Sequence, residues 1–118
     1  MKQILVASAL LETGAGLVLL VAPAMAIGLV FDLPGAGAGV FIGRIAGAAL
    51  LSLGAACWLA RLDGGSAALR GLVTGMLIYN AAIVALVVTS TLGPPGQILW
   101  SIAALHGAMA IWCAWSFR

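Results

Sequence analysis

Residues 35–61 read GAGAGVFIGRIAGAALLSLGAACWLAR, an apolar run long enough to cross a lipid bilayer. Four of its glycines recur at every fourth position: Gly35, Gly39, Gly43 and Gly47. This spacing places them in one stripe along a helix, and such a stripe indicates a second helix packed at close range. Beside the stripe stands Arg44, a charge within an apolar segment, and a buried arginine requires a partner.

The composition of the whole chain favours a membrane protein over a water-soluble one. Of its 118 residues, 64% are hydrophobic and only 7% are Asp, Glu, Lys or Arg, whereas soluble domains are roughly 25% charged. The formal net charge of +2 is too small and too scattered for a nucleic-acid-binding surface, so no nucleic-acid partner is expected. Because no polar linker interrupts the chain, residues 1–118 are predicted to form a single domain.

The start of the chain resembles a secretory signal peptide, with Lys2 before an apolar run and the tripeptide AMA at residues 24–26. However, Glu12 and Thr13 interrupt this run, and the run up to Pro23 is longer than the apolar region of a signal peptide. We therefore expect a membrane-spanning helix here.

Four segments are long enough to span a membrane: residues 4–22, 38–60, 69–91 and 97–117. Residues 93–96, GPPG, predict a tight turn, and Ser66 is a candidate N-cap for the third span. Residues 24–31 are too few to span, and either continue the first helix past a kink or form a short interfacial helix. Short connections make successive helices antiparallel neighbours, so the predicted fold is an all-α, up-down-up-down four-helix bundle.

The distribution of charge predicts the orientation of the bundle. Four of the five lysines and arginines fall on the side of both termini and the middle loop: Lys2, Arg61, Arg70 and Arg118. The positive-inside rule then places both termini of this expected multi-pass membrane protein in the cytoplasm. Tryptophans near the helix ends, such as Trp58, Trp115 and Trp100, match the aromatic belts of membrane proteins.

Strongly polar residues occur once or twice in each span, and counting about 1.5 Å per residue places them near one depth. These residues are Glu12, Arg44, Tyr79, Asn80 and His106. We hypothesise that Glu12 and Arg44 form an ion pair and that the other three complete a hydrogen-bonded network. Two interpretations stay open, since such a network either fixes helix register or binds a ligand or proton.

Sequence signatures of common catalytic and cofactor sites are absent. There is no phosphate-binding GxxxxGK[ST] loop, HExxH or CxxC, so no catalytic residue and no cofactor is assigned and the chain is not expected to be an enzyme. His106 is the only histidine, which argues against a metal or haem site. Cys57 and Cys113 are predicted to be small buried hydrophobes, and the Ser52 hydroxyl to bond a carbonyl of its own helix.

Two stretches resemble the small four-helix bacterial membrane proteins of the largely uncharacterised DoxX-like group. They are LLETGAGLVLLVAP at residues 10–23 and GRIAGAALLSLG at residues 43–54. The resemblance implies a four-helix architecture in a bacterial inner membrane, and it implies no reaction. The length, the helix number and the embedded Glu12 are also similar to small multidrug resistance transporters, but their third-helix glycine-and-tryptophan signature is missing.

Two function classes follow. In the first, the chain is a non-catalytic helix-packing component, as a homo-oligomer or an accessory subunit, whose partners are the bilayer and other transmembrane helices. In the second, it binds or transports a small molecule coupled to a proton. There Glu12 would titrate, Arg44 would be its counter-charge or an anion clamp, and Tyr79, Asn80 and His106 would select the ligand.

Overall fold

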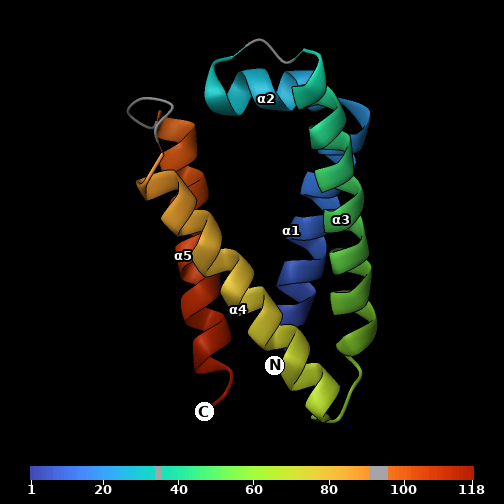
Figure 1. The fold of residues 1–118 in the computed structure, drawn as a ribbon. Helices are drawn as coiled ribbons and strands as arrows, with labels where there is room; N and C mark the ends of the chain where they lie inside the picture. Colours follow the sequence, from blue (N-terminus) through green and yellow to red (C-terminus); the bar gives the residue numbers. More distant parts are fainter. Residues whose placement is uncertain (34–35, 91–95) are drawn as a thin grey trace. The chain divides into compact units, whose positions relative to one another are not determined.

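The computed structural model describes residues 1–33, 36–90 and 96–118, and in these ranges the chain forms five α-helices and no β-strand (Figure 1). The helices are α1 (Lys2–Val21), α2 (Pro23–Phe31), α3 (Ala38–Ala60), α4 (Ala67–Val88) and α5 (Gln97–Trp115). All except α2 are long and apolar enough to cross a membrane. The prediction of an all-α chain with four candidate spans is therefore confirmed.

The helix bounds differ from the predicted ones by two to three residues at several ends, because local caps set them. The prediction for α4 began at residue 69, whereas the helix begins at Ala67, since the hydroxyl of Ser66 accepts a hydrogen bond from the Leu69 amide at 3.1 Å. It ends at Val88 rather than at residue 91. Residues 91–95, which include most of the predicted GPPG turn, lie outside the described residues, as does Gly35.

The loop before α4 is organised by a single carboxylate. Asp63 accepts hydrogen bonds from the Gly65 amide at 2.9 Å, the Ser66 amide at 2.9 Å and the Ser66 hydroxyl at 2.7 Å. These donors, chiefly those of Ser66, hold the pKa of the exposed Asp63 carboxyl below its usual value. Gly65 has φ +104°, a conformation that favours glycine at this turn.

The stretch after Pro23 is a helix of its own and not a continuation of α1. Ala22 leaves helical geometry at φ −133° and ψ 52°, and Pro23 has no amide hydrogen to extend the hydrogen bonds of α1. The left-handed residue Asp32 closes α2, with its amide donating to the Gly28 carbonyl at 3.0 Å. In Figure 1, α2 turns away from the common direction of α1 and α3.

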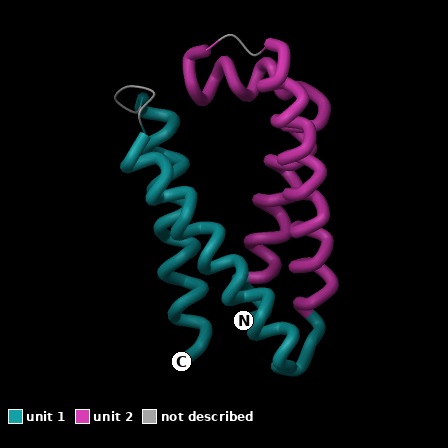
Figure 2. Tube along the Cα trace, viewed as in Figure 1, with its two compact units in different colours: residues 1–4, 62–118 teal, residues 5–61 magenta. Residues whose placement is uncertain are grey.

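The chain forms two compact units, shown in Figure 2. Residues 5–61 hold most of α1 together with α2 and α3, and residues 1–4 and 62–118 hold α4 and α5. In the unit of residues 1–4 and 62–118, buried residues recur along α4 at spacings typical of a packed helical seam: Leu69, Val73, Met76, Asn80 and Val87. That the chain forms one domain stays a prediction.

Candidate functional site

The closest helix packing in the unit of residues 5–61 lies between α1 and α3, where glycines bring the two backbones together. A Cβ atom on Gly47 would lie 2.8 Å from the Gly16 carbonyl oxygen and 2.9 Å from the Leu20 amide nitrogen. Seven residues further along α3, a Cβ atom on Gly54 would lie 2.5 Å from the hydroxyl oxygen of Thr13. Rising residue numbers in α1 thus meet falling numbers in α3, so the two helices are antiparallel.

The described glycines of the predicted stripe pack against two different helices. Gly47 lies against α1, whereas a Cβ atom on Gly43 would lie 3.2 Å from Pro23 and one on Gly39 would lie 3.8 Å from Ile27, both in α2. Gly54, and Gly16 one turn from Glu12, do not belong to the predicted stripe. For Gly54 a signal existed, since a residue seven positions after Gly47 occupies nearly the same face of a helix.

The register of α1 against α3 does not bring Glu12 and Arg44 together, contrary to the hypothesised ion pair. Glu12 is one residue from Thr13, which lies beside Gly54, and Arg44 is ten residues before Gly54. At about 1.5 Å per residue, roughly 15 Å separates Arg44 from the level of Gly54 along α3. Glu12 is buried, with 5% of its surface exposed, whereas Arg44 is exposed. Counting residues from the end of each helix placed Glu12 and Arg44 near one depth, but such counting does not predict how α1 and α3 are aligned with each other.

The α4–α5 hairpin brings three of the predicted site residues together. Asn80 is only 1% exposed, and its Oδ1 lies 2.7 Å from Nδ1 of His106. The same amide donates from Nδ2 to the Met76 carbonyl at 2.7 Å. The Tyr79 ring meets the His106 ring edge-on, with centroids 5.5 Å apart and planes at 83°. The result is a polar cluster of Tyr79, Asn80 and His106, in which Asn80 is buried and the two rings are partly exposed.

The hydrogen bonds of Asn80 determine the tautomer of His106. Since Nδ2 of Asn80 donates to the Met76 carbonyl, the atom facing His106 is Oδ1, which only accepts. Nδ1 of His106 must therefore carry the hydrogen. In the neutral ring this leaves the lone pair of Nε2 as the atom that accepts a proton or a hydrogen bond. The cluster is thus built to position one imidazole nitrogen.

Three further polar side chains have surroundings that the sequence did not predict: a buried hydroxyl and two arginines that lie over tryptophan rings. The hydroxyl of Ser8 is fully buried and has no hydrogen-bond partner among the described residues. At the C-terminal end of α3, the Arg61 guanidinium lies 3.6 Å from the centroid of the Trp58 ring, and it donates to the Trp58 carbonyl. In the other unit, Arg118 lies 5.1 Å from the Trp115 ring centroid.

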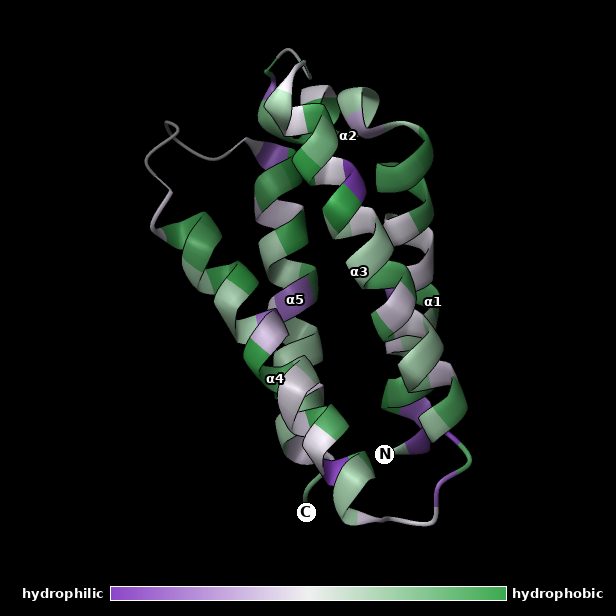
Figure 3. Ribbon diagram, turned by 45° about the vertical axis from the view of Figure 1, so that its right-hand side comes forward, coloured by the Kyte–Doolittle hydropathy of each residue, from purple (hydrophilic) through white to green (hydrophobic). Residues whose placement is uncertain are grey.

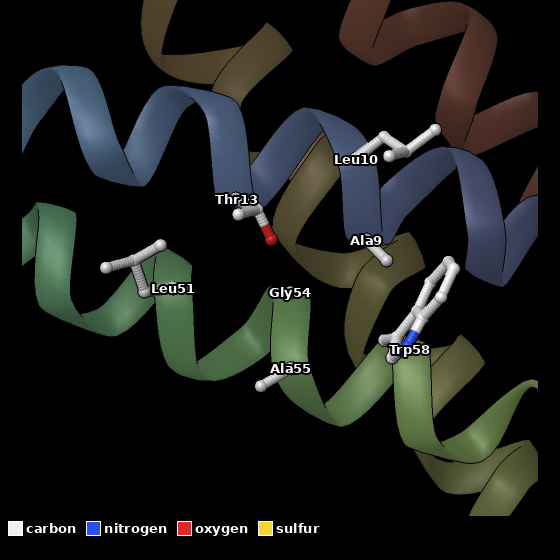
Figure 4. Close-up of a pocket in the computed structure, with 7 residues that line it drawn as sticks. All are labelled: Ala9, Leu10, Thr13, Leu51, Gly54, Ala55 and Trp58. Atoms are coloured by element: carbon white, nitrogen blue, oxygen red, sulfur yellow. The ribbon is translucent and has the colours of Figure 1, made fainter.

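A groove of about 430 Å³ runs along one face of the α1–α3 hairpin (Figure 4). Its lining is almost entirely apolar, with the Thr13 hydroxyl pointing toward α3 and Trp58 near its end. Such a lining suits a hydrocarbon ligand and offers no set of polar groups for a reaction. Within residues 1–33, 36–90 and 96–118, no three His, Cys, Asp or Glu side chains gather as metal ligands do.

Comparison with known proteins identifies no relative of this chain. No protein-family model, no curated protein and no solved structure matches it. The resemblance to the DoxX-like group therefore stays a prediction.

Proposed function

We propose that the chain is an integral membrane protein that serves as a non-catalytic helix-packing component, as a homo-oligomer or an accessory subunit of a membrane complex. Its four long helices cross the bilayer up and down, with both termini in the cytoplasm of a bacterium. The residues buried within the chain make up only 17–33% of the most apolar window of each span. The rest of each span is left to lipid or to other helices, and Figure 3 shows how hydrophobic these helices are.

The exposed hydroxyls in the long helices support a lipid environment. Ser52 donates to the Ala48 carbonyl at 2.9 Å, Thr74 to the Arg70 carbonyl at 2.9 Å, and Ser101 to the Gln97 carbonyl at 2.9 Å. Each bond satisfies a side chain within its own helix, which is what polar groups require where no water is present. The expected carbonyl bond of Ser52 is confirmed.

The observation that carries the helix-packing proposal is an unused glycine pair on α4. Gly71 and Gly75 are both exposed, and a Cβ atom on either would meet no heavy atom within 4 Å. Their spacing is that of the small-xxx-small motif that lets two membrane helices approach closely. Among the described residues, Gly47 and Gly54 already meet α1, whereas the α4 pair meets no atom and is available to a helix outside the chain.

Gly75→Leu tests this proposal, because the larger side chain blocks close approach on that face without meeting this chain. We expect the variant to lose the assembly that the wild-type protein forms in mild detergent, as measured by native mass spectrometry, while its helical circular dichroism is unchanged. Gly14→Leu is the matched control, since Gly14 also has open space around it. A wild-type protein that is monomeric and brings no partner from native membranes would contradict the proposal.

A second candidate function, proton-coupled binding of a small molecule, is favoured by the Nε2 atom that the Asn80–His106 bond leaves as an acceptor. Glu12 remains the proposed titrating carboxylate, without Arg44 as its counter-charge. Under this proposal Glu12→Gln and His106→Ala each remove ligand binding but leave assembly intact. Under the packing proposal they change stability and no ligand is found in either protein.

A further inference from the structure

We propose that the groove on the α1–α3 hairpin holds one acyl chain of an anionic phospholipid whose phosphate is bound by Arg61. The inference rests on the proposed insertion of the protein in a membrane, and it adds a lipid ligand that the packing proposal does not require. The groove and the cation belong to the same unit, residues 5–61.

The walls of the groove suit a hydrocarbon chain. Gly54 forms its floor, where α1 and α3 lie closest, and Leu51 and Trp58 flank this floor along α3 (Figure 4). The seven steps from Leu51 to Trp58 along α3 span about 10 Å, enough for a segment of an acyl chain. A polar ligand would find one hydroxyl there, that of Thr13, and would lose its hydration without replacement.

The walls of the groove are exposed on the surface of the unit of residues 5–61. Leu10 and Trp58, which line it from the two helices, are 66% and 45% exposed. Ala55, on the same side of α3, is exposed as well. The unit of residues 5–61 therefore leaves this apolar surface uncovered by its own side chains, and in a bilayer lipid chains are the hydrocarbon that surrounds it.

Charge complementarity selects the headgroup. Arg61 follows the last turn of α3, and its guanidinium stacks on the same Trp58 ring that lines the groove. One of its donors bonds the Trp58 carbonyl, and a guanidinium has five N–H donors in a fork that matches phosphate oxygens. The position at a helix end by the predicted cytoplasmic face places this cation at headgroup level, where a basic residue beside a groove binds anionic lipid.

The experiment is native mass spectrometry of the full chain in detergent, titrated with phosphatidylglycerol or with phosphatidylcholine carrying the same acyl chains. We expect tighter binding of phosphatidylglycerol, and a loss of about fivefold in its affinity for Arg61→Gln with no change for phosphatidylcholine. Arg118→Gln is the matched control, because Arg118 also stacks on a tryptophan but lies outside the groove.

A second pair of variants tests the groove itself. Ala55→Phe fills it and should weaken both lipids, whereas Ala56→Phe, on the next exposed position of α3, should weaken neither. Equal effects of Arg61→Gln and Arg118→Gln, or of Ala55→Phe and Ala56→Phe, would overturn the inference.

Extraction of native membranes with alkaline carbonate separates the failure of the lipid-site proposal from the failure of the membrane proposal. Release of the chain refutes membrane insertion, whereas retention without lipid selectivity refutes the lipid site alone.

Discussion

Gly47→Ala should weaken the packing of α1 against α3. The new Cβ atom would lie 2.8 Å from the Gly16 carbonyl oxygen, about 0.6 Å inside the 3.4 Å at which ordinary contact begins. The Leu20 amide nitrogen, at 2.9 Å, is equally close. Both atoms belong to the backbone of α1, so no side-chain rotation relieves the overlap and α1 must move away from α3.

The expected cost follows from two opposing effects. Overpacking of this kind destabilises by about 1–3 kcal/mol, and a separation of half an ångström also forfeits roughly a quarter of each dispersion contact along the interface. Replacing glycine by alanine in a helix returns up to about 1 kcal/mol. We therefore expect the free energy of unfolding to fall by about 1–2 kcal/mol for Gly47→Ala.

Reversible unfolding by sodium dodecyl sulfate from mild detergent, followed by circular dichroism, measures this difference. Gly14→Ala is the control, because Gly14 is in α1 and a Cβ atom there meets nothing within 4 Å. The control should gain stability or stay unchanged. If both variants have the same free energy of unfolding, the backbone contact between α1 and α3 does not stabilise the protein and our reasoning is wrong.

Three further predictions concern polar groups. Asn80→Ala should remove the hydrogen from Nδ1 of His106, seen as a change of tautomer in ¹⁵N nuclear magnetic resonance, and a double-mutant cycle with His106→Ala should give a coupling of about 0.6 kcal/mol. A negligible coupling would contradict the bond. The pKa of Asp63 is lowered in the folded protein, so the ionised carboxylate stabilises the folded loop. This stabilisation is fully present above the unfolded pKa near 4 and is lost as the pH falls through the folded pKa. Amide chemical shifts of the loop should titrate accordingly, and not in Asp63→Asn. Glu12→Gln and Arg44→Ala should change the free energy of unfolding additively, and non-additivity above ~0.5 kcal/mol would restore the ion pair.

The sequence predicted the long helices well because their signals are local. Apolar runs of sufficient length, with short polar or glycine-proline segments between them, mark spans without any knowledge of packing. The remaining differences arise at caps. Ser66 was recognised as a candidate N-cap, yet the predicted start of α4 was set by the apolar pattern rather than by that cap.

The polar residues show where sequence reasoning ends. Counting residues from the ends of α4 and α5 placed Asn80 and His106 at one level, and the structure joins them at 2.7 Å. The same counting placed Glu12 and Arg44 within reach of each other, but the register of α1 against α3 keeps them apart. That register depends on which glycines of α1 and α3 meet, and the meeting of Gly16 with Gly47 is a property of two surfaces in three dimensions.

The contact between Gly16 and Gly47 also has a consequence for the biogenesis of the protein. The two glycines are 31 positions apart, and α2 is made between them. At ~5–20 residues per second, a ribosome needs several seconds to complete α3 after α1 has emerged. Throughout that interval the face of α1 that carries Gly16 has no α3 to pack against, and Glu12 is held by a lone helix. Under the proposed membrane insertion of the chain, we expect the insertion machinery to retain α1 until α3 arrives, so that the two helices enter the lipid as a pair.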